Sequence, residues 1–176
     1  MQSLVVRFLC VMAVIVLNLT ALNAQAGTAT ANLAVQIIIT ASCTINAASL
    51  NFGSNAGTTL VSTDITANTT VSVTCTSGSP YAIGMDNGAN VSGSQRRMKS
   101  GSNFLNYNLY VDSLMTNPWT TATAGPPPAC TTANSCFLGT GSGSPQSVSI
   151  YGKVPSIGTA PPTGTYTDTV TMTITY

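Results

Sequence analysis

Alternation of apolar and polar residues is the feature that most restricts how this chain can fold. The alternation is clearest at the end of the sequence, where single threonines separate Val170, Met172, Ile174 and Tyr176. Similar alternation occurs in Val71–Cys75, Tyr81–Met85, Leu105–Val111 and Val148–Ile150. An apolar residue at every second position gives a β-strand one apolar face. No segment after residue 26 has the 3.6-residue period of a helix, so we predict an all-β fold.

Turn signals rich in glycine and proline separate these segments. They occur at Ser77–Pro80, Asp86–Gly88, Gly139–Pro145 and Pro161–Gly164. Several short strands with regular turns are typical of a β-sandwich. The chain has 176 residues and 44% of them are hydrophobic, which suits one domain with its own core. We therefore predict a single sandwich domain.

Charged residues are rare: five are Lys or Arg, four are Asp, and there is no His. A nucleic-acid binder needs more cations than this to neutralise phosphates. A hydrolase or metalloenzyme usually needs His or paired carboxylates for proton transfer or metal ligation. Asp86 in its Asn-Gly turn and Asp168 are interpreted as turn or edge residues rather than calcium ligands or a catalytic pair. We expect no catalytic residue, no metal site, no cofactor and no nucleic-acid partner.

The first 26 residues have the features of a secretory signal. Arg7 precedes the apolar run Phe8–Leu17, and Ala24-Gln25-Ala26 forms an A-x-A cleavage site. A transmembrane anchor is less favoured, because polar residues interrupt the run before it reaches about 20 apolar residues. We predict cleavage after Ala26, which leaves a mature chain with no net formal charge.

Cleavage removes Cys10 and leaves an even set of four cysteines. Four cysteines allow three pairings, and an exported compartment lets disulfides persist. The spacing contains no C-x2-C pair of the kind that binds zinc. We expect structural disulfides between neighbours in sequence, Cys43 with Cys75 and Cys130 with Cys136.

The two ends of the mature chain do not fit a self-contained sandwich. The sequence stops at Tyr176, within a strong strand pattern. Shortly before Cys43, five apolar residues alternate with other residues: Ala31, Leu33, Val35, Ile37 and Ile39. Ile38 weakens this alternation, because it places an apolar residue on the polar face. On the pattern alone, an ordinary first strand that pairs within its own sheet explains the segment equally well.

Several short blocks of the mature chain occur in an order that resembles a known family. The blocks are Asn51–Gly53, Val71–Thr76, Pro80-Tyr81, Arg97-Met98, Leu105–Asp112, Ile150–Pro155 and Gly164–Val170. Together they resemble the spore coat protein U domain family, which includes subunits of Csu-type pili from the archaic chaperone–usher pathway. The segment Pro127–Cys136, with its second cysteine pair, departs from the family pattern.

The resemblance implies an incomplete immunoglobulin-like β-sandwich, completed by a donor strand from a neighbouring subunit. It divides the chain into a signal peptide (1–26), an N-terminal donor-strand extension (27–41) and a pilin domain (42–176). The donor strand would insert the side chains of Ala31, Leu33, Val35, Ile37 and Ile39. The last strand would line the acceptor groove with Val170, Met172, Ile174 and Tyr176.

The implied function is that of a structural, non-enzymatic subunit of a chaperone–usher pilus. Such a subunit polymerises by donor-strand exchange and supports surface adhesion and biofilm formation. Its partners would be copies of itself or related pilins in a head-to-tail filament, a periplasmic chaperone and an outer-membrane usher. It would be exported through the periplasm to a cell-surface pilus, as a rod or adaptor subunit. The alternative is a self-contained, monomeric secreted β-sandwich that serves as a lectin-like binding module or a coat component.

Two features of the predicted domain leave a choice. Trp119 is either a core anchor or a surface aromatic that binds a ligand. Gln95–Lys99 holds three of the four cations of the mature chain. We interpret it as a solvated loop rather than as a contact for an acidic surface or a neighbouring subunit.

Overall fold

The computed structural model describes residues 26–46, 48–119 and 136–176, and in these ranges the regular structure is almost entirely β. The strands are β1 (Cys43–Ile45), β2 (Ile65–Cys75), β3 (Pro80–Met85), β4 (Arg96–Ser100), β5 (Asn103–Tyr110), β6 (Phe137–Thr140), β7 (Gln146–Val154) and β8 (Met172–Thr175). The helical element is one short 3₁₀ turn, η1 (Thr59–Val61). The all-β prediction is confirmed. The predicted signal peptide lies outside the described residues except for Ala26.

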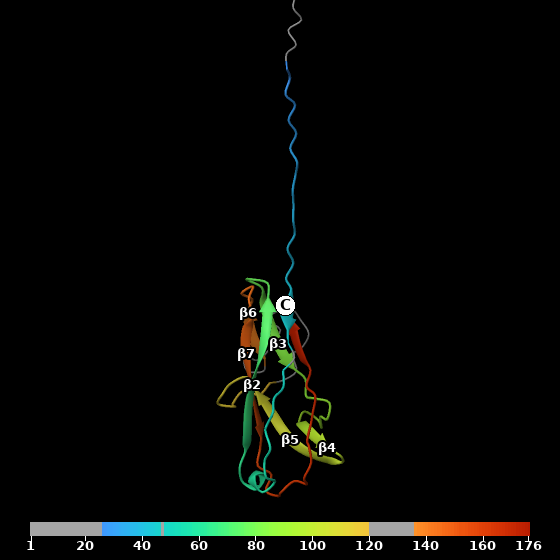
Figure 1. Ribbon diagram of the computed structural model, residues 1–176, viewed down its shortest axis with the longest axis vertical. Coiled ribbons are helices and arrows are strands. Elements are labelled where there is room, and N and C mark those ends of the chain that lie inside the picture. Colours follow the sequence, from blue (N-terminus) through green and yellow to red (C-terminus); the bar gives the residue numbers. More distant parts are fainter. Residues whose placement is uncertain (1–25, 47, 120–135) are drawn as a thin grey trace, which may run out of the picture. The chain divides into compact units, whose positions relative to one another are not determined.

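The strands form two antiparallel sheets (Figure 1). The larger sheet has the order β1-β2-β7-β5-β4, and the smaller has the order β6-β3-β8. The predicted alternation sets the register: Val71 of β2 lies opposite Val148 of β7, and both side chains are buried. Their neighbours Ser72 and Ser149 are half-buried on the other face.

The apolar faces of the two sheets form one core. Its most deeply buried side chains include Val73, Tyr81, Ile83 and Trp119. Trp119 is only 1% exposed, and its backbone N–H donates to the carbonyl of Leu109 at 2.8 Å. Of the two roles open to Trp119, the core anchor is therefore the correct one.

The interpretation of Gln95–Lys99 as a solvated loop is wrong. Arg96–Ser100 forms β4, which pairs with β5 so that Arg96 lies opposite Tyr107. Arg96 points inward and is only 4% exposed. The buried guanidinium is tolerated because backbone carbonyls that are distant in sequence accept its hydrogen bonds.

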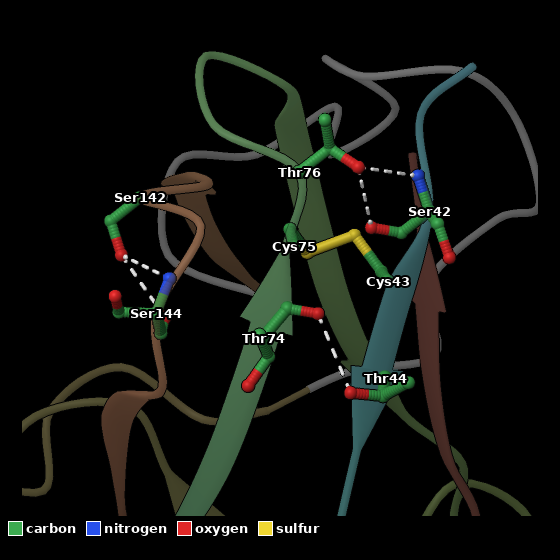
Figure 2. The surroundings of a disulfide bond; sticks show 8 residues. All are labelled: Ser42, Cys43, Thr44, Thr74, Cys75, Thr76, Ser142 and Ser144. Atoms are coloured by element: carbon green, nitrogen blue, oxygen red, sulfur yellow. Dashed lines mark hydrogen bonds between the residues drawn. A yellow bond between two sulfur atoms is a disulfide. The ribbon is translucent and has the colours of Figure 1, made fainter. Parts of the chain in front are cut away.

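The predicted disulfide between Cys43 and Cys75 is present and ties β1 to β2 (Figure 2). The two cysteines lie directly opposite each other in the ladder, and the Thr76 hydroxyl accepts the Ser42 N–H at 3.0 Å next to them. A crosslink with a sequence separation of 32 stabilises a fold by about 3–4 kcal/mol in the loop-entropy account. Cys136 is buried and disulfide-bonded, whereas Cys130 lies outside the described residues, so the second pair stays a prediction.

Residues Ile39–Tyr176 form one compact unit, and the residues up to Ile38 belong to a second unit. From residue 26 to residue 42 the chain has no helix or strand, and every residue is exposed. Within the described ranges, no helix has the length and apolar character needed to cross a membrane.

Candidate functional site

The sandwich is open along one side, where a groove of about 930 Å³ reaches its interior. One wall consists of residues 48–55, which follow β1; we call it the N-terminal wall. The other consists of residues 161–170 and Met172, which lead into β8; we call it the C-terminal wall. The walls come together where β1 contacts β8. They end near η1, where the Gly57 backbone packs against Pro161.

Apolar side chains of the core form the floor of the groove. They come from both sheets and include Met85, Leu105, Tyr107, Leu109, Ile150 and Val154. Five apolar side chains of the walls are only half-buried against this core: Leu50, Phe52, Tyr166, Val170 and Met172. The sandwich therefore leaves part of its apolar interior open at the groove.

The C-terminal wall has hydrogen-bond partners along only one of its edges. Thr167 exchanges backbone bonds with Lys99 at 2.8 and 3.0 Å, and the carbonyls of Thr169 and Thr171 accept N–H groups that follow β3. Within the part of the chain that the structure describes, the backbone groups of Tyr166, Asp168 and Val170 have no partner. In an extended chain these alternate residues direct their N–H and C=O groups to the opposite edge, which borders the groove.

The N-terminal wall is held by packing rather than by a ladder. Backbone-to-backbone bonds are absent for Ala48–Asn51 within the described segments. Leu50 and Phe52 rest on Gly152 of β7, where a Cβ atom would collide with both side chains. Each wall thus borders the groove with unpaired backbone, which is the arrangement that pairs with an added strand.

Asp168 connects the C-terminal wall to the floor. Its carboxylate accepts the Tyr107 hydroxyl at 2.7 Å and the Asn90 backbone N–H and side-chain amide at 3.1 and 2.9 Å. Burial raises the pKa of Tyr107, and the hydrogen bond to Asp168 raises it further. The phenol therefore stays protonated and donates this bond.

Asp86 and Arg96 form a second polar cluster behind the same wall. The Asp86 carboxylate accepts the N–H groups of Gly88 and Thr171, each at 2.9 Å. Although burial acts to raise the pKa of Asp86, these hydrogen bonds hold that pKa below its ordinary value. The Arg96 guanidinium donates to the carbonyls of Asp86, Trp119 and Met85, and burial lowers its pKa. Asp86 thus has the turn role expected from the sequence.

The acceptor residues expected from the resemblance lie at different depths. Val170 and Met172 line the groove, whereas Ile174 is half-buried against the core beyond it and Tyr176 is 50% exposed. The expected donor side chains Leu33, Val35, Ile37 and Ile39 are 79–87% exposed, and Ala31 is exposed. Sequence reasoning did not identify the N-terminal wall or the contact between Tyr107 and Asp168, although the blocks that carry the resemblance contain both residues.

The carboxylates at the groove hold its wall together. In the ranges that the structure describes, no three His, Cys, Asp or Glu side chains are grouped closely enough to hold a metal ion. Asp168 and Asp86 are both occupied by hydrogen bonds that fix the wall. The geometry suits the addition of an extended segment of chain.

Comparison with solved structures shows a shared fold. The chain is similar to a chain in the crystal structure of the CsuC-CsuE chaperone-tip adhesion subunit pre-assembly complex from archaic chaperone-usher Csu pili of Acinetobacter baumannii. The TM-score is 0.55 at 24% sequence identity, and the match covers 78% of this chain and 40% of that chain. The fold is an incomplete immunoglobulin-like sandwich, as the resemblance implied.

Comparison with family profiles and with curated proteins concerns the sequence itself. No curated protein matches the chain significantly. The profile of the Spore Coat Protein U domain matches residues 29–173, which is most of the chain. The protein therefore belongs to the Spore Coat Protein U domain family.

Proposed function

We propose that this protein is a chaperone–usher pilus subunit that polymerises by donor-strand exchange. The observation that carries the proposal is the groove, which combines an apolar floor with unpaired backbone on both walls. This combination suits β-augmentation, in which main-chain bonds give affinity and alternate side chains fill pockets. The occupant would be the segment Ala31–Ile39 of a second copy or of a related pilin.

The length of this donor segment matches the groove. Beyond the bend at Thr163-Gly164, the C-terminal wall has seven residue steps from Thr165 to Met172, or about 23 Å of chain. From Ala31 to Ile39 the donor segment has eight steps, or about 26 Å. Burial of its large apolar side chains would contribute on the order of 6–10 kcal/mol, at about 1.5–3 kcal/mol for each.

The short connection between the donor segment and its own domain selects the direction of the added strand. Only Thr40–Ser42 separate Ile39 from the start of β1, so the connection spans at most about 13 Å. In Figure 1, β1 lies at the same end of the domain as the C-terminus, and η1 lies at the opposite end. A donor strand parallel to the C-terminal wall would leave the groove at the β1 end, so each subunit would meet both neighbours at that one end. An antiparallel strand leaves at the η1 end and gives an open head-to-tail filament.

The same geometry supports a need for a chaperone. An empty groove exposes an apolar sheet edge, which promotes aggregation until a strand covers it. A periplasmic chaperone would supply that strand, and an outer-membrane usher would exchange it for the donor segment of the next subunit. The resulting surface pilus would support adhesion and biofilm formation.

Gel electrophoresis of the full mature chain, residues 27–176, tests the proposal. We expect a ladder of gel bands that resists SDS and collapses to a single band on boiling. Strand addition would bury both the backbone hydrogen bonds of the added strand and its apolar face. A chain that folds without a chaperone and stays monomeric would contradict the proposal. That result would favour the alternative of a self-contained secreted binding or coat module.

A further inference from the structure

Asp168 lies where the C-terminal wall passes from one sheet to the other. Its neighbour Thr167 pairs with Lys99 of β4, which belongs to the larger sheet. Thr169 pairs instead with Ala89, in the segment that follows β3 of the smaller sheet. Between these two attachments, the Asp168 carboxylate is held by Tyr107 of β5 and by Asn90.

The Asp168 carboxylate and its partners are tightly packed. Gly88 has φ +81°, and a Cβ atom at this position would collide with the Asp168 carboxylate. Tyr107 is 4% exposed, and its ring belongs to the floor of the groove. One residue therefore supplies both the surface on which an added strand would rest and the hydroxyl that holds the wall beside it.

The wall needs such support while the groove is empty. It is bonded along one edge only, and its half-buried side chains adjoin a hollow of about 930 Å³ with an apolar floor. Apolar side chains next to an apolar hollow gain free energy by moving inward, which would narrow the groove. Hydrogen bonds to an ionised carboxylate are about twice as strong as neutral ones and oppose that movement.

We propose that the hydrogen bond between Tyr107 and Asp168 holds the groove in its strand-accepting shape before a strand arrives. Tyr107 and Asp168 are then positioning residues for strand addition, an assignment that rests on the proposed function. By keeping the groove open, they raise the rate at which a strand is added. The finished polymer depends on them much less, because the added strand itself then holds the wall.

The first test measures hydrogen exchange of wall amides in the full mature chain with an empty groove. The chain carries Val35→Asp, a substitution in the donor segment that is expected to prevent polymerisation. Tyr107→Phe removes only the hydroxyl, and we expect hydrogen exchange at the Ala89, Asn90 and Thr167 amides to accelerate about fivefold. Tyr81→Phe is the matched control, because Tyr81 is a buried tyrosine that does not line the groove. Unchanged exchange in Tyr107→Phe would overturn the proposal.

The second test measures strand addition with the wild-type donor segment. After dilution from denaturant, we expect SDS-resistant ladders of Tyr107→Phe to form about fivefold more slowly. The temperature at which finished ladders dissociate should stay close to that of Tyr81→Phe. Asp168→Asn replaces one of the two acceptor oxygens with an NH2 donor, so it loses either the Tyr107 bond or both Asn90 bonds and should slow ladder formation at least as much as Tyr107→Phe does.

The two proposals fail in different ways. If Tyr107→Phe forms ladders at the wild-type rate, the positioning role alone is overturned. The same holds if this variant lowers both the rate of ladder formation and the dissociation temperature. If the wild-type chain forms no ladder, donor-strand exchange is contradicted, and the exchange measurement still decides whether the contact holds the wall.

Discussion

Replacing Val35 by Asp is expected to abolish polymerisation of the mature chain. Val35 is the central apolar residue of the donor segment and would lie over the floor near Tyr107. An ionised carboxylate placed there loses its hydration without gaining a partner, which costs several kcal/mol. This cost removes much of the 6–10 kcal/mol estimated for the whole segment. Gel electrophoresis without boiling should show the ladder replaced by a single monomer band.

Ala34→Asp is the matched control for this substitution. It adds the same charge one residue away, on the face of the donor strand that would point to solvent. Its ladder should therefore match that of the wild type. Equal loss of the ladder in both variants would show that charge in the segment disrupts assembly for another reason, and persistence of the ladder in Val35→Asp would contradict insertion of this face.

Arg96→Met should lower the free energy of unfolding by about 3–5 kcal/mol. The guanidinium donates to the carbonyls of Asp86 and Trp119 at 2.6–2.9 Å, and to that of Met85 at 3.3 Å. Methionine fills similar space but leaves these buried acceptors without a donor. The loss is large because one buried side chain bonds the end of β3, at Met85 and Asp86, to Trp119.

Arg97→Met provides the comparison, because Arg97 is the adjacent residue on the outer face of β4. Its guanidinium bonds the carbonyls of Asn90 and Val91 at 3.0 and 3.4 Å and lies 4.2 Å from the Phe104 ring centre, where it is partly exposed. We expect a loss below about 1 kcal/mol. Fluorescence of the single, buried Trp119 during denaturant unfolding measures both values in the monomeric Val35→Asp background. Similar losses for the two arginines would contradict the structural role given to Arg96.

The alternation in the sequence predicted β2, β3, β5, β7 and β8, but it missed β1, β4 and β6 and did not show which strands lack a neighbour. Val170–Tyr176 alternates throughout, yet within the described residues only Met172–Thr175 forms a strand, because the chain just before it crosses from Lys99 of the larger sheet to Ala89 beside the smaller one. Local sequence records which face of a segment is apolar. It does not record whether another strand of the same chain will lie beside it.

Charge was the least reliable guide. The run Gln95–Lys99 was interpreted as solvated because charged residues are rarely buried. The structure buries Arg96 because carbonyls 10 and 23 residues away accept its bonds, and such partners cannot be identified from the local sequence. The contact between Tyr107 and Asp168, which are 61 residues apart, escaped prediction for the same reason.

Disulfide trapping between two copies tests donor-strand exchange most directly. Centring the donor segment on the C-terminal wall in the antiparallel direction places Ala34 opposite Thr169. The Thr169 carbonyl bonds away from the groove, so this is a non-hydrogen-bonded pair with Cα atoms about 4.5 Å apart, within the range for a disulfide. Mixing Ala34→Cys with Thr169→Cys chains should give covalent dimers that survive boiling without reductant. The exposed Ser113→Cys should give none with either.

A second pair reports the strand direction in the same experiment. With Thr167→Cys, an antiparallel donor strand crosslinks through Gln36→Cys, whereas a parallel one crosslinks through Asn32→Cys. We predict trapping of Ala34→Cys with Thr169→Cys and of Gln36→Cys with Thr167→Cys. Ser113→Cys, tested at the same protein concentration, gives the background level of covalent dimer. If no donor cysteine exceeds that background, insertion of residues 31–39 into the groove is contradicted.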